Sequence, residues 1–564
     1  MTRSAPQSPW LGLYGAGVDH DLQAPKATIL DLFLNSVEAD RAAPAVHYFG
    51  RSMNRTELAD LSSRVAEVLQ DDGVRAGDRV AVSLQNTPMF AAVTLATWSL
   101  SGVVVPINPM LRPDELTPML TDSGARTLVA HPAMRDVIDV VRGRLGGLLS
   151  TWWSDPSELA GEMDLPFGAA TAVYAGMRFL LDATADVSGI EPRRPDPSDV
   201  ALLTYTSGTT GPSKGAMSTH ANIAYQVQNC QQWFGFHCKS SVLTVAPLFH
   251  ITGIGAHLAL GLGGGFPLVM TYRFEPTTVL RLIRAYRPTF AVGAITAFIA
   301  MLDSAPDSGE TLASLETVYS GGAPVPMNVV ERFEAASTRY IHNIYGLTET
   351  TSACIGVPHG VVAPIDEASG ALSVGVPMGG TMVTIVDDEG LVVPAGTQGE
   401  IVVSGPQVNA GYWNNPEQTT LAFQADGMHT GDIGVMDDAG WVYVVDRKKD
   451  LVVVSGYKVW PRDVEDVIYR HPAIKEVAVV GKPDEYRGET LHAYYSTRPG
   501  HTVAESELRA WCKVHLSAYK VPTAYFLIND LPKTPTGKIL RRSLRDTQPT
   551  SSATPDDHAA RPEQ

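Results

Sequence analysis

A stretch rich in glycine and hydroxyl side chains follows the apolar run 200–203. Its sequence is Thr204-Tyr205-Thr206-Ser207-Gly208-Thr209-Thr210-Gly211-Pro212-Ser213-Lys214-Gly215. Glycine tolerates positive φ angles, so such a loop can turn several backbone N–H groups and hydroxyls toward one anion. We therefore interpret residues 200–203 as a strand that leads into a polyphosphate-binding loop with a single lysine.

This stretch differs from the P-loop pattern G-x-x-x-x-G-K-[ST]. Ser213 stands before Lys214 and Gly215 stands after it, so the ending of that pattern is absent. A flexible surface linker has a similar composition and is the alternative for this stretch taken alone. Other stretches whose side chains could bind a nucleotide decide between the two interpretations.

Three further stretches could bind parts of a nucleotide. Residues 320–324, Ser-Gly-Gly-Ala-Pro, leave a strand with small side chains and would let a flat ring approach the backbone. Residues 345–350, Tyr-Gly-Leu-Thr-Glu-Thr, combine groups suited to a base face, a phosphate oxygen and a Mg²⁺ ion that keeps most of its waters. Residues 429–432, His-Thr-Gly-Asp, offer a carboxylate able to accept from two ribose hydroxyls. Each of these is also compatible with an ordinary turn.

A lysine near the C-terminus is the last candidate. Lys538 follows Gly537 in the loop-like segment 531–542. Taken alone, it would be interpreted as a solvated surface lysine.

The elements that must position these residues form an alternating pattern. Apolar periodicity predicts helices over 57–69 and 89–100, with strands at 79–84, 103–106 and 127–130. Strands also follow at 242–246, 266–270 and 317–319. Strands that alternate with helices indicate βαβ units and a mainly parallel sheet.

The pattern of predicted strands and helices changes twice toward the C-terminus. Short strands separated by turns fill 374–445 and are typical of a β-barrel or β-sandwich. A helix over 461–469, strands near 477–480, 491–496 and 524–528, and a helix over 503–516 predict a small separate α+β domain. Residues 145–197 are weakly patterned. We expect an α/β protein with two αβα-type subdomains, a β-barrel-like subdomain and a small α+β C-terminal domain.

Composition excludes several classes of protein. A formal net charge of −17 argues against a surface that coats nucleic acid. The four cysteines have neither C-x-x-C nor zinc-finger spacing, which favours reduced thiols in the cytoplasm. The uncharged stretches 80–111 and 251–270 are interrupted by proline or glycine, so we expect buried elements and no transmembrane segment. Peripheral membrane contact and oligomeric state stay open.

Together and in this order, the five stretches resemble the adenylate-forming superfamily, which includes acyl- and aryl-CoA synthetases, adenylation domains of peptide synthetases and beetle luciferases. The resemblance extends over about residues 30–545. Within the superfamily, residues 444–459, 519–522 and 538–542 look most like bacterial medium- and long-chain fatty-acyl-CoA ligases. It implies ATP, Mg²⁺ and CoA as cofactors, and activation of a carboxylic acid to an acyl-adenylate before transfer to CoA.

The resemblance also assigns roles to individual residues. The catalytic set would be Lys538 at the α-phosphoryl group, Thr206, His250 at the carboxylate and acyl pocket, and Glu349 as the metal ligand. Those expected to hold ATP are Thr206, Ser207, Gly208, Thr209, Thr210 and Lys214 at the β,γ-phosphates, Thr348 at the α-phosphate, Gly321, Gly322, Ala323, Tyr345 and Gly346 around adenine, and Asp432 and Arg447 at the ribose.

One domain pose cannot serve both steps, because Lys538 must cover ATP and CoA must then approach from the same side. By resemblance, residues 1–447 form the adenylation domain, 448–545 a mobile C-terminal domain that pivots at Lys449, and 546–564 a disordered tail. Rotation would bring Gly456, Tyr457 and Lys458 to the pantetheine tunnel.

Two other hypotheses accompany this one. The enzyme could adenylate an aromatic or specialised acid and pass the acyl group to CoA, an amine or a carrier protein. The chain could also be a catalytically idle ATP-binding scaffold, although all five motifs retain the side chains that the chemistry requires.

Overall fold

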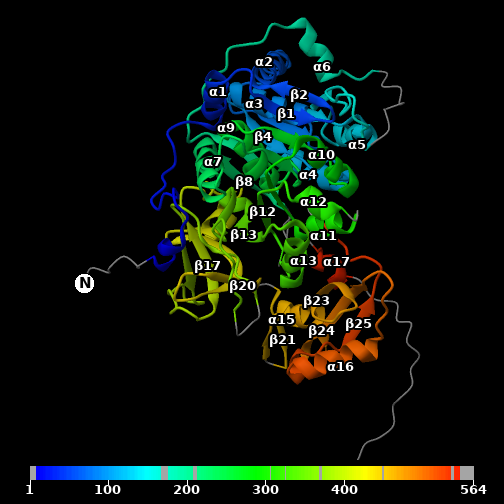
Figure 1. Cartoon of the computed structure of the whole chain (residues 1–564). Coiled ribbons are helices and arrows are strands. Elements are labelled where there is room, and N and C mark those ends of the chain that lie inside the picture. Colours follow the sequence, from blue (N-terminus) through cyan, green and yellow to red (C-terminus); the bar gives the residue numbers. More distant parts are fainter. Residues whose placement is uncertain are drawn as a thin grey trace, which may run out of the picture. The chain divides into compact units, whose positions relative to one another are not determined.

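The computed structural model describes residues 8–166, 176–206, 213–304, 307–323, 325–366, 371–447, 450–455, 457–484, 486–534 and 539–546. The chain divides into two compact units, Met1–Val444 and Val445–Gln564 (Figure 1). Several sequence predictions lie outside the described residues: Ser207, Gly208, Thr209, Thr210, Lys449, Gly456, Lys538 and, from residue 547, the expected disordered tail.

The largest sheet of the first unit has nine strands. Its spatial order is β15 (Val376–Pro377), β14 (Ser352–Gly356), β13 (Ile341–Leu347), β12 (Thr317–Gly321), β11 (Phe290–Gly293), β9 (Val242–Thr244), β10 (Leu268–Met270), β1 (Pro44–Tyr48) and β2 (Arg51–Asn54). The strands from β13 to β1 are parallel, and antiparallel strands close both edges. Parallel strands covered on both faces are apolar throughout, which explains why β9, β10 and β11 are buried along their whole length.

A second sheet of six strands carries the N-terminal βαβ units. Its order is β6 (Ser150–Trp153), β5 (Thr127–Ala130), β3 (Arg79–Ser83), β4 (Val103–Pro106), β7 (Val200–Thr206) and β8 (Lys214–Thr219). All neighbours are parallel except the β7–β8 hairpin. Side chains alternate across the sheet: Val80 and Val82 join the main core, and Ala81 joins a second core on the opposite face.

Helices supply both cores of this unit. The main core includes residues of α1 (Ile29–Ala39), α2 (Arg55–Asp71) and α3 (Pro88–Ser99), and the second core includes α4 (Pro113–Ser123) and α5 (Arg135–Arg144). A capping box between Asn54 and Glu57 starts α2. Every residue of α3 is buried, as predicted for the uncharged stretch 80–111.

The first unit contains further helical segments. They are η1 (Pro9–Leu13), η2 (Pro132–Met134), α6 (Leu180–Ala183), η3 (Thr184–Asp186), α7 (His220–Trp233), α8 (Ile251–Gly253), the π-helix η4 (Ile254–Ala259), α9 (Leu260–Gly264), α10 (Pro276–Tyr286), α11 (Ile295–Ser304), α12 (Ser308–Leu312), α13 (Met327–Ser337), η5 (Thr348–Thr350) and α14 (Pro416–Ala422).

The predicted β-rich segment forms a third sheet. It contains β16 (Met382–Val386), β17 (Gly399–Ser404), β19 (Gly427–Met436) and β18 (Phe423–Gln424), with β20 (Val442–Arg447) paired to β19. The pairs β16–β17, β17–β19 and β18–β19 are antiparallel. This sheet carries Asp432 on β19.

The second unit is a small α+β domain. Its sheet contains β22 (Tyr457–Val459), β21 (Val452–Val454), β24 (Gly488–Thr497), β23 (Ile474–Asp484) and β25 (Ala524–Leu527). The helices α15 (Pro461–Tyr469) and α16 (Glu505–His515) pack on one face, and Leu544 of α17 (Arg541–Asp546) packs on the other (Figure 1). A short 3₁₀ helix, η7 (Ala518–Lys520), precedes β25.

The expected fold class is confirmed: a large N-terminal α/β domain is followed by a smaller C-terminal domain. In the described part of the chain, no helix combines the length and the apolar character needed to cross a bilayer.

Candidate active site

The β7–β8 hairpin places two of the predicted phosphate-binding residues opposite each other. Thr206 ends β7, Lys214 opens β8, and the two are partners in the ladder. The Thr206 hydroxyl donates to the Lys214 carbonyl at 3.5 Å. We expected Lys214 within the loop, and this was wrong: Lys214 is the first residue of β8, where it pairs with Thr206 of β7. The intervening residues 207–212 are outside the described chain, so their phosphate contacts stay a prediction.

The Lys214 ammonium group is directed by two side chains that the sequence did not reveal. It lies 5.1 Å from the centroid of the Tyr412 ring, and it donates to Oε1 of Gln418 on α14. A ring face attracts a cation, and an amide oxygen accepts from it, so both contacts hold the positive charge in one place.

Residues 410–413 reach this position by pairing with β8. The Met217 N–H donates to the Gly411 carbonyl at 3.0 Å, and the Trp413 N–H donates to the Gly215 carbonyl at 2.8 Å. The pairing carries Tyr412 beside Glu349, and its hydroxyl donates to Oε1 of that carboxylate at 2.6 Å. Burial and then the Glu349 charge raise the pKa of Tyr412, so the hydroxyl keeps the proton that it donates.

Glu349 lies in η5, directly after β13, and Asn409 fixes the backbone there. The Asn409 N–H donates to the Glu349 carbonyl at 2.9 Å, and its side-chain amide donates to the Thr348 carbonyl at 3.0 Å. The Thr351 hydroxyl donates to Oδ1 of the same Asn409 side chain at 2.7 Å. Glu349 is half-buried and, among the described residues, makes no ion pair. A single carboxylate with a neutral donor fits Mg²⁺, which commonly takes one or two carboxylates together with substrate phosphates.

The glycines of the predicted adenine pocket have a structural role within the sheet. Gly321 is paired with Ile344, and a Cβ at Gly321 would lie 2.3 Å from the Ile344 carbonyl oxygen. A Cβ at Gly346 would lie 1.9 Å from the Ser352 carbonyl oxygen. Gly322 has a φ of +78°. Close strand pairing therefore requires glycine at 321 and 346 even without a bound adenine ring. Gly322 and the half-buried Ala323 lie past the end of β12.

Tyr345, the predicted adenine contact, is bonded to Asp432, the predicted ribose contact. The Tyr345 hydroxyl donates to Oδ2 of Asp432 at 2.7 Å. Burial and then the Asp432 charge raise the pKa of Tyr345, so this hydroxyl also keeps its proton. Asp432 is 5% exposed, and its N–H donates to the Thr430 hydroxyl at 3.1 Å.

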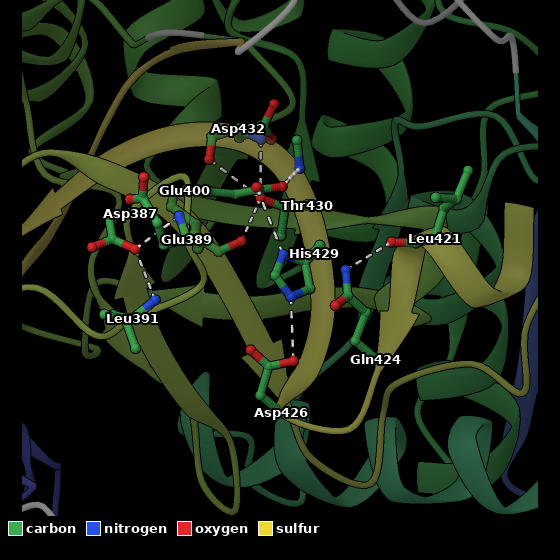
Figure 2. A network of polar contacts seen from close by, with 12 residues as sticks. Asp387, Glu389, Leu391, Glu400, Leu421, Gln424, Asp426, His429, Thr430 and Asp432 are labelled. Carbon is green, nitrogen blue, oxygen red and sulfur yellow. Dashed lines mark hydrogen bonds and ion pairs between the residues drawn. The ribbon is translucent and has the colours of Figure 1, made fainter.

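Polar contacts extend from Asp432 along β19 (Figure 2). The Thr430 hydroxyl donates to the Ile401 carbonyl at 2.7 Å, and the Gly431 N–H donates to Glu400 at 3.0 Å. His429 lies between two carboxylates, 3.6 Å from Glu400 and 3.2 Å from Asp426. These contacts hold the irregular part of β19, at Gly431, that presents Asp432.

His250 begins the helical segment that follows β9. Its Nδ1 accepts from the Thr252 N–H at 3.3 Å, so the ring caps α8. In η4 a Cβ at Gly255 would lie 3.1 Å from the Thr351 carbonyl oxygen. The segment after His250 therefore packs against the turn that follows Glu349.

Three further predicted residues, Arg447, Tyr457 and Lys458, lie in the described part of the second unit. Arg447 ends β20, and Lys458 lies in β22 opposite Val453. Tyr457 is 57% exposed and stacks on Tyr519, with the ring centroids 4.6 Å apart. An exposed aromatic pair is a surface on which a ligand chain can lie.

Sequence reasoning missed Tyr412, Asn409 and Gln418. Asn415 followed by Pro416 is a recognisable helix start, and it does cap α14. That signal locates the helix that carries Gln418, but no local pattern links Tyr412 to Glu349, 63 positions away in the sequence.

Comparisons with known proteins identify the family of this chain. The AMP-binding enzyme family matches residues 33–413, and the AMP-binding enzyme C-terminal domain matches residues 463–538. The chain therefore belongs to the AMP-binding enzyme family.

Individual relatives and a solved structure match over nearly the whole length. The chain is 31% identical over 558 residues to a long-chain-fatty-acid–CoA ligase of Bacillus subtilis, covering 96% of this chain and 98% of that protein. It is 33% identical to a feruloyl-CoA synthase of Amycolatopsis sp, covering 89% and 95%. The crystal structure of ATP-bound MatB from Rhodopseudomonas palustris matches with a TM-score of 0.81 at 28% identity, covering 92% of this chain and 98% of that one.

Proposed function

We propose that this protein is an AMP-forming acid–thiol ligase that joins a medium- or long-chain fatty acid to CoA. One observation carries the proposal: Thr206, Lys214, Tyr345, Glu349 and Asp432 converge within one unit, although they come from separate segments of the chain. The family relationship and the fatty-acid ligases among the relatives support the same activity.

The reaction overcomes the low electrophilicity of a carboxylate. One carboxylate oxygen attacks the α-phosphorus of ATP, the bond to the β-phosphate breaks, and pyrophosphate leaves. The thiolate of CoA then attacks the acyl carbon, and AMP leaves. Negative charge develops on the α-phosphoryl oxygens in the first transition state, so positioned cations should contribute most of the acceleration.

The large unit holds ATP in this proposal. Lys214 and the hydroxyls of the loop that starts at Thr206 bind the β,γ-phosphates, and Thr348 contacts the α-phosphate. When Mg²⁺ is bound beside Glu349, it neutralises part of the phosphate charge. Tyr412 orients the Glu349 carboxylate through its 2.6 Å hydrogen bond.

Nucleoside and acid bind on either side of the phosphates. Gly321, Gly322, Ala323, Tyr345 and Gly346 form the adenine pocket, and Asp432 with Arg447 binds the ribose. Oδ2 of Asp432 accepts from the Tyr345 hydroxyl, which links the ribose contact to the adenine contact. His250 lines the carboxylate end of the acyl pocket.

The small domain serves both half-reactions in turn. Residues 448–545 form this mobile domain, and they rotate about Lys449 between adenylation and thioester formation. Lys538 stabilises the α-phosphoryl charge in the first pose. Gly456, Tyr457 and Lys458 line the path of pantetheine in the second, where the exposed Tyr457–Tyr519 stack offers an apolar contact.

An aromatic acid is the second candidate substrate, because the feruloyl-CoA synthase relative is as similar in identity as the fatty-acid ligase. A panel of carboxylic acids, scored for pyrophosphate release with and without CoA, tests both. We expect CoA-dependent acyl-CoA formation with medium- to long-chain fatty acids. Preference for an aromatic acid, or turnover with an amine in the absence of CoA, selects the second candidate. Absence of pyrophosphate release with every acid refutes the adenylating activity.

A further inference from the structure

The turn that follows Glu349 has a strained backbone. Thr351 and Ser352 have φ angles of +49° and +97°, in the region that residues other than glycine rarely adopt. In the described part of the chain, they are the only two neighbouring residues other than glycine that share this conformation. Such strain persists only where surrounding contacts hold it, and it is concentrated at functional sites. The contacts around this turn therefore indicate what keeps Glu349 in place.

Asn409 contacts the chain on both sides of Glu349. Its Nδ2 donates to the Thr348 carbonyl at 3.0 Å, and its Oδ1 accepts from the Thr351 hydroxyl at 2.7 Å. Its backbone N–H donates to the carbonyl of Glu349 itself at 2.9 Å. Asn409 is 5% exposed, so these hydrogen bonds lie in a medium where water competes little for them. One residue thus contacts three of the four positions 348–351.

The segment that carries Asn409 is itself fixed by other elements. The Asn222 side chain of α7 donates to the Val408 carbonyl at 3.1 Å. The Ala410 N–H donates to the Met217 carbonyl of β8 at 3.1 Å. The residues before and after Asn409 are therefore held without any help from the strained turn.

Asn409 also connects this turn to the phosphate-binding hairpin. The Ser218 hydroxyl of β8 donates to Oδ1 of Asn409 at 3.2 Å, and Ser218 is fully buried. The same strand opens with Lys214, the predicted contact of the β,γ-phosphates. A Mg²⁺ ion that joins a carboxylate to substrate phosphates needs near-ideal octahedral geometry, so the two must be held at a fixed separation. The Asn409 amide bridges the two elements that set this separation.

We propose that Asn409 is a positioning residue for metal binding: it holds the strained turn that presents Glu349 at a fixed position relative to β8, on which Lys214 lies. This inference rests on the proposed function, in which Glu349 binds Mg²⁺ beside the phosphates of ATP. Replacing a residue that orients a metal ligand typically lowers metal affinity or activity about 10- to 100-fold. Without the Asn409 contacts the strained turn should relax, and the carboxylate should move away from the phosphates.

The test uses two substitutions that remove parts of this contact. Asn409→Leu keeps the approximate size of the side chain and removes its amide, and Thr351→Val keeps the branched shape and removes the hydroxyl that donates to Asn409. The matched control is Asn229→Leu, which removes a fully buried amide of α7 that donates to the Tyr225 hydroxyl at 3.4 Å.

The main measurement is the affinity of Mn²⁺ for the complex of the full chain with ATP, without an acid substrate. Mn²⁺ accepts the same oxygen ligands as Mg²⁺, and it is paramagnetic. Water-proton relaxation distinguishes the ternary complex from Mn²⁺–ATP in solution, so the measurement needs no turnover. ATP–pyrophosphate exchange is then followed as a function of Mg²⁺ concentration, and thermal unfolding gives the folded fraction of each variant.

We expect Asn409→Leu to weaken Mn²⁺ binding about tenfold and Thr351→Val about threefold, while Asn229→Leu lowers only the thermal stability. In a Glu349→Gln background, Asn409→Leu should have no further effect on Mn²⁺ affinity, because both substitutions act through one ligand. Thr351→Val should behave in the same way, and it decides alone if Asn409→Leu does not fold.

Unchanged Mn²⁺ affinity in the folded variants, or an undiminished effect in the Glu349→Gln background, overturns the inference. Unchanged Mn²⁺ affinity in Glu349→Gln itself, or absence of exchange in the unmodified protein, instead refutes the proposed function.

Discussion

Two sets of carboxylates show how differently the two units use acidic side chains. In the large unit Glu349 is half-buried, and its partner is the neutral Tyr412 hydroxyl. In the small unit Asp446, Asp450 and Glu465 are buried and gather around the guanidinium group of Arg541. A buried acid is stable as an anion only when a cation and hydrogen bonds compensate its lost hydration.

The difference separates a binding role from a structural one. The three acids around Arg541 are already paired with cations or backbone N–H donors, so they offer little to a metal ion. Glu349 receives a hydrogen bond that orients it without cancelling its charge. The same residue type is therefore suited to hold the domain together in one place and to bind a cation in the other.

We expect the largest effect from replacing Lys538, the cation that the small unit contributes. Lys538→Ala should lower ATP–pyrophosphate exchange about 1,000-fold, because a charge-stabilising donor is lost from the transition state. Thioester formation from supplied acyl-adenylate should survive, since that step does not use Lys538. Equal loss of both half-reactions would remove Lys538 from the first step.

Replacing Glu349 tests the large unit's side of the comparison. Glu349→Gln should slow exchange about 100-fold, roughly 2.7 kcal/mol in activation free energy, and raise the Mg²⁺ concentration needed for half-maximal rate. Tyr412→Phe serves as the graded control: it leaves the charge and removes only the 2.6 Å hydrogen bond, so about a fivefold loss is expected. An unchanged Mg²⁺ dependence in Glu349→Gln would argue against a metal ligand.

A restriction of backbone rotation at Lys449 tests whether the small domain must rotate between the two half-reactions. Proline fixes φ near −65°, so Lys449→Pro should limit rotation between the two poses. We expect thioester formation to fall about tenfold more than adenylation, measured as the two half-reactions on one preparation. Parallel decline of both rates would show that residue 449 is not the pivot.

We expect the smallest effect at a partly buried carboxylate that forms no ion pair among the described residues. Glu158 lies in the large unit, and burial, followed by the charge of Asp155, raises its pKa from 4.5 to about 8. Between these values the folded protein binds more protons than the unfolded chain, so the free energy of unfolding should fall as pH rises from about 4.5 to about 8.

Glu158→Gln should remove this fall, and the variant should gain thermal stability relative to the unmodified protein at pH 8 but not at pH 4.5. Thermal unfolding midpoints at the two pH values measure the effect. The exposed Glu162→Gln substitution is the control, and it should leave the pH dependence unchanged. A Glu158→Gln variant with the same pH dependence as the unmodified protein would contradict the assignment.

The sequence predicted the elements that have strong apolar periodicity or a proline or glycine at their ends. Helix α15 has the predicted limits Pro461 and Tyr469, because a proline starts an amphipathic segment with a clear apolar face. The buried helix α3 was found from its uncharged composition and its flanking proline and glycine. Strand β6, by contrast, is a short edge strand in a weakly patterned region and left no signal.

The site was predictable as a set of motifs but not as an arrangement. The stretches suited to phosphate, base and ribose binding were recognised from their residue types, and the roles of individual side chains came from the resemblance to the adenylate-forming superfamily. Their mutual contacts depend on strand pairing between distant segments, such as residues 410–413 along β8. Such pairings are long-range, so the roles of Tyr412 and Asn409 became visible only in the folded chain.

Oxygen transfer tests the central claim most directly. The enzyme is incubated with ATP, Mg²⁺, CoA and a fatty acid labelled with ¹⁸O at both carboxylate oxygens, and the masses of the products are measured by mass spectrometry. Attack of a carboxylate oxygen on the α-phosphorus predicts one ¹⁸O in each AMP and none in pyrophosphate. Unlabelled AMP, or ADP together with ¹⁸O-labelled inorganic phosphate, would contradict an acyl-adenylate intermediate.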